Sequence, residues 1–231
     1  MEGLCGRVAS GVAAFTCRRP RYAHPEPKPG YSDRELGDQL VKAARSDVAR
    51  IRDRVRAAEA LLARYHAEPG TLDPAESGRV SLLASMASTG EIPDLPGPAV
   101  QTALRRREIA GQLFLTMRDM APLLVLLVAV TGCNIETIKE LPAGHRIIED
   151  RAVELRVVKR RRGQHRWFET VTWEIGPAGS QLRTPGGLYL LACELTRRSR
   201  AVSGTRLLWS VWRHGRRAGV TGAAEHYGLF D

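Results

Sequence analysis

The feature of this sequence that most constrains its fold is a long apolar stripe near the N-terminus. Apolar side chains recur at steps of three and four residues, with one gap at Ala44, and this is the spacing of one face of an α-helix. The stripe consists of Leu36, Leu40, Val48, Ile51, Val55, Leu62 and Tyr65. Ser32 and Glu35 precede it with the spacing of a capping box. We therefore predict one long helix over 33–66, which ends before Pro69.

Three more helices are predicted between residues 73 and 130. Asp73-Pro74-Ala75-Glu76 combines a capping Asp with a proline at the first helical position, so a helix should run from there to about Ala87. Another should cover Ala99 to Asp119. Its inward side chains are expected to be Leu104, Ile109, Leu113, Phe114 and Met117. Pro122 opens a helix that is apolar on all sides, so we expect that helix at the centre of the core.

The pattern changes from helical to β-type near residue 143. Residues 152–159 and 167–174 are rich in β-branched and aromatic side chains and alternate roughly between apolar and polar. A polar loop that contains Gly163 separates them, so they are predicted to pair as a β-hairpin. The expected fold class is therefore mainly α with a small antiparallel β-sheet (α+β).

The two ends of the chain differ in character. Residues 1–30 finish in the proline-rich sequence HPEPKPG, which blocks helices and strand pairing, so a disordered tail is predicted there. Near the other end, a last helix is predicted over Leu188 to Arg198. Trp209 and Trp212 follow it at a spacing of three residues and are expected to pack in the core.

Positive charge is concentrated in the last third of the chain. The sequence has 35 Lys+Arg against 25 Asp+Glu, a net charge of +10, and fifteen basic but only six acidic residues follow position 150. Such a surplus favours a polyanionic partner, either nucleic acid or an anionic membrane face. A basic surface that is merely solvated stays an alternative. The longest apolar run, 122–130, is too short to cross a bilayer, which needs about 20 residues.

The densest basic segment is the predicted hairpin tip, where five of the eight residues from Lys159 to Arg166 are basic. Arginine binds phosphate oxygens through two parallel hydrogen bonds, and a narrow two-stranded tip fits a DNA groove. We therefore expect double-stranded DNA as the partner. The expected DNA-binding residues are Arg160, Arg161, Arg162, His165 and Arg166. The alternative is a hairpin charged only to keep its edges from aggregating, a role for which lysine would be enough.

The four cysteines show no C-x-x-C spacing and no accompanying histidine cluster. A metal site or a disulfide framework is therefore not expected, and neither a cofactor nor a small-molecule substrate is predicted. Free thiols fit a reducing cytoplasm. With a DNA partner, the expected location is cytoplasmic and nucleoid-associated.

After the apolar helix the chain continues with TGCNIETIKEL at 131–141, and the basic hairpin with Lys159 follows. This order resembles the start of the catalytic domain of the tyrosine recombinases, the phage-integrase family. In that family an apolar helix runs into T-G-x-R-x-x-E-L-x-x-L and then into a small sheet that bears a catalytic lysine. The matching positions are Thr131, Gly132, Ile138 and Leu141, with Lys159 on the hairpin lysine.

The resemblance covers about 120–185 and implies how the chain is divided. A helical region over 31–119 would stand in the place of a DNA-clamping part, and 120–231 would be a partial tyrosine-recombinase-like catalytic domain with a basic β-hairpin. The implied activity is DNA recombination or integration. Lys159 is implied as a catalytic residue, and other recombinase subunits are implied as partners besides DNA.

Departures from the family pattern argue against cleavage. Asn134 stands where the family has its first catalytic arginine, and Glu136 stands one position before the family's acid. An H-x-x-R box occurs at His214 and Arg217, but Tyr227 follows it more closely than the family's nucleophile does. The family's C-terminal H-x-x-R and tyrosine segment is therefore expected to be missing, and the protein is expected to bind DNA without cleaving it alone.

Two alternatives stay open. The first is an active but diverged recombinase that uses His214, Arg217 and Tyr227. The second is a helical adaptor that binds RNA or an acidic protein through the basic hairpin. Trp167, beside the loop, is a candidate for base stacking in either case.

Overall fold

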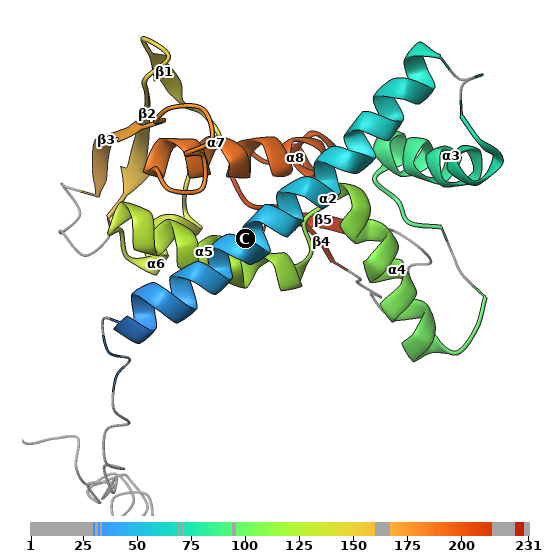
Figure 1. Ribbon diagram of the computed structural model, residues 1–231, viewed down its shortest axis with the longest axis horizontal. Helices are drawn as coiled ribbons and strands as arrows, with labels where there is room; N and C mark the ends of the chain where they lie inside the picture. Colours follow the sequence, from blue (N-terminus) through green and yellow to red (C-terminus); the bar gives the residue numbers. More distant parts are fainter. Residues whose placement is uncertain are drawn as a thin grey trace, which may run out of the picture.

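A computed structural model describes residues 30, 32, 34–68, 70, 72–93, 96–159, 167–213 and 225–228. The described chain is mainly helical with a small three-stranded antiparallel sheet, which confirms the α+β class (Figure 1). One long helix runs diagonally through the molecule, with the sheet near one end and two shorter helices near the other (Figure 1). The predicted tail lies outside the described residues, apart from Gly30.

The long helix confirms the apolar stripe. It begins as the π-helical segment η1 (Glu35–Val41) and continues as α2 (Lys42–Ala67). The capping box is present, because the Ser32 amide donates to Glu35 Oε2 at 2.9 Å and the Glu35 amide donates to Ser32 Oγ at 3.2 Å. The buried side chains of α2 are Ala44, Val48, Ile51, Val55, Ala58, Leu61 and Leu62. The apparent gap at Ala44 is therefore part of the buried face.

The next helix, α3 (Pro74–Thr89), begins and ends as its sequence signals predict. Asp73 Oδ1 accepts a hydrogen bond from the Glu76 amide at 2.7 Å, and Pro74 occupies the first helical position. Gly90 follows with φ +74°, a left-handed conformation that favours glycine at a helix end.

The single helix predicted over Ala99 to Asp119 is wrong beyond Leu113. Helix α4 (Ala99–Leu113) ends where Phe114 becomes extended, and α5 (Met117–Thr131) starts three residues later. The Trp212 amide donates to the Leu115 carbonyl at 2.8 Å, so the linking residues pair with a distant strand instead of continuing a helix. Pro122 consequently lies inside α5 and does not open it.

This break also changes which side chains are buried. Leu113 and Phe114 are in the core as expected, but Leu104 is 43% and Met117 is 50% exposed. Leu123, Leu126 and Leu127 of α5 are fully buried, which confirms that the apolar helix lies at the centre of the core.

The hairpin prediction is confirmed. Strands β2 (Ala152–Val158) and β3 (Phe168–Glu174) pair antiparallel, with Leu155 opposite Val171. A short strand that the sequence did not predict, β1 (Arg146–Ile148), pairs with the other edge of β2. The sheet order is therefore β1-β2-β3.

The last predicted helix is two helices. Helix α7 (Pro185–Leu195) starts three residues earlier than expected, and α8 (Arg197–Ser203) follows it directly. Gly186 allows α7 to start against β3, because a Cβ there would lie 2.5 Å from the Trp173 carbonyl oxygen. Strands β4 (Ser210–Arg213) and β5 (Glu225–Gly228) form a second, two-stranded sheet that was not predicted.

Two clusters of buried side chains share helix α2. The first joins the N-terminal half of α2 to α5, α7 and the three-stranded sheet, and Trp209 is 1% exposed within it. The second joins the C-terminal half of α2 to α3 and α4, and Trp212 is 2% exposed within it. Both tryptophans are thus core residues, as predicted. The division of the chain near residue 120 stays a prediction.

A membrane-crossing helix is not found: among the residues described, every helix is too short or too polar for one.

We expect Asp119→Ala to lower the free energy of unfolding by about 2–3 kcal/mol. The buried Asp119 Oδ2 accepts hydrogen bonds from the Thr116 amide at 2.8 Å, from Thr116 Oγ1 at 2.9 Å and from Arg54 Nη2 at 3.1 Å. The substitution would leave a buried N–H without a partner. Urea-induced unfolding measures the change. The control is Glu136→Ala, which removes an exposed ion pair and should shift the value by about 0.5 kcal/mol or less. Equal losses in the two variants would contradict the role of Asp119.

Candidate nucleic-acid interface

The β2–β3 hairpin is paired up to the start of its basic segment. The Lys159 amide donates to the Trp167 carbonyl at 2.6 Å, one position beyond the last strand pair, Val158 with Phe168. The expected DNA-binding residues fall on 160–166, which lies outside the described residues. These residues are Arg160, Arg161, Arg162, His165 and Arg166. Both strands that carry the segment are thus defined, and the segment 160–166 between Lys159 and Trp167 is seven residues long.

Lys159 lies at the end of the hairpin and forms an ion pair. Its Nζ is 2.8 Å from Glu169 Oε2, and the two side chains are 22% and 35% exposed. Glu169 is the register partner of Val157, a buried residue on the packed face of the sheet. The ammonium group is therefore held at the border of the core by a carboxylate. A proton-donating role for Lys159 would require it to leave this partner.

The segment that resembles the recombinase motif contacts the same end of the hairpin. Helix α5 ends at Thr131, and Gly132 turns the chain with φ +64°. The short helix α6 (Ile135–Lys139) then begins, and Thr137 Oγ1 donates to the Val158 carbonyl at 3.0 Å. This bond joins the motif to the residue that immediately precedes Lys159.

Asn134 acts here as a helix cap. Its Oδ1 accepts a hydrogen bond from the Thr137 amide at 2.9 Å, which satisfies a free donor at the start of α6. The carboxamide is uncharged and already engaged. Glu136 is likewise engaged, because Lys139 Nζ lies 3.1 Å from its Oε1 at the surface. Asn134 therefore has a structural role as the cap of α6, whereas Glu136 forms an exposed ion pair.

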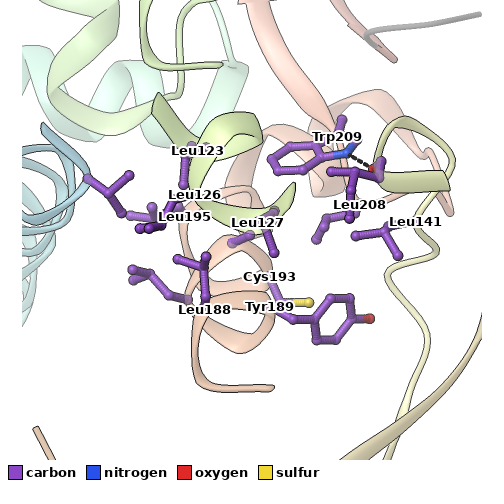
Figure 2. Close-up of a cluster of buried hydrophobic side chains, with 14 of the residues drawn as sticks. Leu123, Leu126, Leu127, Leu141, Leu188, Tyr189, Cys193, Leu195, Leu208 and Trp209 are labelled. Carbon is purple, nitrogen blue, oxygen red and sulfur yellow. Dashed lines mark hydrogen bonds between the residues drawn. The ribbon is translucent and has the colours of Figure 1, made fainter. Parts of the chain in front are cut away.

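Hydrogen bonds from a later segment fix α6 on its other side. Trp209 Nε1 donates to the Ile138 carbonyl at 2.6 Å, the dashed contact in Figure 2. The Leu208 amide donates to the Leu141 carbonyl at 2.8 Å, and these two leucines lie beside Trp209 in the buried cluster (Figure 2). Helix α6 is thus held between the hairpin and the chain that leads into β4.

Tyr189, in the same cluster, is an anchor of the core. Its hydroxyl donates to the Pro142 carbonyl at 2.8 Å, and burial raises its pKa well above the ordinary tyrosine value. Burial also raises the pKa of the neighbouring Cys193 thiol. Burial therefore disfavours the deprotonated form of both groups, which is the more nucleophilic one.

The residues of the alternative active site are only partly described. His214 and Arg217 lie outside the described residues. The backbone of Tyr227 is in β5, opposite Val211 of β4. The use of these three residues in catalysis stays a prediction.

Two residues that the sequence reasoning missed lie on the outer face of the hairpin. The guanidinium carbon of Arg156 is 4.1 Å from the centroid of the Phe168 ring, and Phe168 is 55% exposed. Arg156 was counted in the basic surplus but was not singled out. The alternation along the two strands could have pointed to these residues, because they alternate with side chains of the packed face, such as Val157.

Some of the arginines form ion pairs that connect helices of the fold. Arg198 Nη2 donates to Glu59 Oε2 at 2.6 Å, and Arg56 forms a two-point contact with Glu194, so ion pairs connect α2 to α7 and α8. Other arginines stay exposed on the described surface. Four of these lie after residue 150 and outside the hairpin, namely Arg151, Arg183, Arg197 and Arg206. They provide a reference set for tests of the hairpin segment.

No family model, curated protein or solved structure matches this chain.

We expect Asn134→Ala to lower the free energy of unfolding by about 1 kcal/mol, because α6 loses its cap. Asn134→Asp keeps an acceptor at the same place and should be close to wild type. Asn134→Arg, which introduces the residue of the family pattern, should cost about as much as the alanine. Urea unfolding curves of the three variants measure this order. An alanine variant as stable as the aspartate variant would show that the cap contributes nothing.

Proposed function

We propose that this protein binds double-stranded DNA through the basic segment of the β2–β3 hairpin and does not cleave DNA on its own. In this proposal it is a diverged relative of the tyrosine recombinases. The observation that carries the proposal is the hydrogen bond from Thr137 Oγ1 to the Val158 carbonyl. It joins the segment that resembles the T-G-x-R motif to the end of the strand that leads into Lys159 and the arginines, and the resemblance rests on these two segments.

Phosphate binding follows from the composition of the segment. Four arginines stand in seven residues, and each guanidinium offers a planar pair of donors to phosphate oxygens. A two-stranded ribbon is narrow enough for the major groove, which is about 12 Å wide. Contacts of this kind position a protein on DNA and do not depend on the base sequence.

The lack of cleavage follows from the chemistry at Asn134. In the reaction that the resemblance implies, a tyrosine attacks a phosphodiester and negative charge develops on the non-bridging oxygens. An arginine normally stabilises that charge, whereas the Asn134 carboxamide is neutral and its oxygen is held by the Thr137 amide. Loss of one such preorganised donor typically costs about a hundredfold or more in rate.

Replacing Arg160, Arg161, Arg162 and Arg166 together by alanine should make duplex binding less dependent on salt. The slope of log affinity against log salt should become less steep by about 3–4, since each phosphate contact contributes about 0.9. Fluorescence anisotropy of a labelled duplex over a salt series measures the slope. The matched control replaces the exposed arginines Arg151, Arg183, Arg197 and Arg206, which removes the same charge elsewhere. Equal losses in both variants would mean that net charge, and not the hairpin segment, determines binding.

A nicked suicide DNA substrate should give no covalent protein–DNA adduct with the wild-type protein. The reason is that Asn134 leaves the transition-state charge without its guanidinium partner. Denaturing gel electrophoresis of the reaction detects an adduct. Tyr227→Phe is the informative control: an adduct formed by the wild type and lost in this variant would favour the diverged but active recombinase.

A further inference from the structure

The three-stranded sheet has one packed face and one open face. Val153, Leu155, Val157 and Trp173 point into the first buried cluster. Because side chains alternate along a strand, their neighbours lie on the opposite face. On that face Arg156 pairs with Thr170, and Val158 pairs with Phe168. Helix α7 contacts β3 and lies to one side of the sheet (Figure 1).

Arg156 and Phe168 form the chemically distinctive pair on this open face. They are diagonal neighbours across β2 and β3, and the guanidinium carbon lies 4.1 Å from the ring centroid. Phe168 is the one aromatic side chain among the large hydrophobic residues exposed in the described part of the chain. Trp167, the residue suggested earlier for stacking, is less exposed than Phe168.

The charges on this face leave Arg156 available to an anion. The neighbouring acid, Glu154, is engaged by Arg146, whose Nη2 lies 2.9 Å from its Oε1. Within the residues described, Arg156 contacts the Phe168 ring and forms no ion pair with a carboxylate. An exposed ring next to an uncompensated guanidinium combines a stacking surface with a phosphate binder, and a nucleotide needs both.

We propose that the Arg156–Phe168 pair binds an unpaired base of single-stranded DNA. The base stacks on the exposed part of the Phe168 ring, and the Arg156 guanidinium, already held at the ring, binds the adjacent phosphate. Bases within a duplex are stacked on each other and do not offer a free face, so this site selects opened strands. The inference rests on the proposed function in one respect, which is that DNA is the ligand. The two sites are separate, because residues 160–166 bind the duplex and this face binds the single strand.

The test compares three labelled probes by fluorescence anisotropy. They are an oligothymidylate of about twelve nucleotides, an abasic oligomer with the same number of phosphates, and a duplex. Wild-type protein should bind the oligothymidylate roughly 5- to 150-fold more tightly than the abasic probe, as expected for one stacked base. Phe168→Ala should abolish this preference, Phe168→Trp should keep it, and Arg156→Ala should weaken binding of both single-stranded probes.

A matched control removes an exposed apolar side chain elsewhere. Leu104 on α4 is 43% exposed, and Leu104→Ala should leave the base preference unchanged. Equal affinity of the wild type for the thymidylate and abasic probes would overturn the inference, whatever the duplex result. A base preference that survives in Phe168→Ala would overturn it too. If the preference depends on Phe168 but the duplex is not bound, the inference stands and the proposed function fails.

Discussion

The structure depends on the burial of a single helix against two separate cores. Helix α2 places Val48, Ile51 and Val55 in the cluster that contains α5 and the sheet, and it places Leu62 in the cluster that contains α3 and α4. Because the apolar stripe follows the 3.6-residue period without interruption, one continuous helix serves both clusters. Asp119 adds a polar link, since it accepts hydrogen bonds from both Arg54 of α2 and Thr116 at the start of α5. Hydrophobic burial and one buried carboxylate thus fix the helices that support the hairpin.

The candidate interface is held by side-chain hydrogen bonds to backbone carbonyls from two segments, α6 and the chain that leads into β4. Thr137 of α6 donates to the end of β2, and Trp209 donates to the carbonyl of the next residue of α6, Ile138. These contacts give the motif segment a structural function that does not depend on catalysis. Asn134 is a good helix cap. In the proposed function this residue also stands where a recombinase would need an arginine, so it leaves the transition-state charge without a guanidinium partner. Lys159 has a partner in Glu169.

The proposals assign two surfaces of one hairpin to two forms of DNA. The segment between the strands carries forked donors that suit phosphates along a duplex. The open sheet face carries a ring with an arginine beside it, and this suits a base that has left the stack. Both surfaces depend on the same strand pairing, because Lys159 closes the hairpin against Trp167 while Phe168 pairs with Val158. A protein that contacts duplex and opened strands side by side would suit a site where DNA strands separate.

Local sequence determined the helix starts, the long amphipathic helix and the hairpin, because caps and periodicity act within a few residues. The Ser32–Glu35 box, the Asp73 cap and the alternation along 152–159 and 167–174 are such signals. The tertiary structure alone decided where α4 ends, since Leu115 pairs with Trp212, almost a hundred residues later in the chain. Thr116 and Asp119 form a capping box at the start of α5, and Asp119 also accepts a hydrogen bond from Arg54 of α2. In the candidate site, the sequence pointed to Lys159 and the basic segment. The ion pair with Glu169 and the contact of Arg156 with Phe168 depend on the strand register, which sets the facing residues only once the sheet has formed.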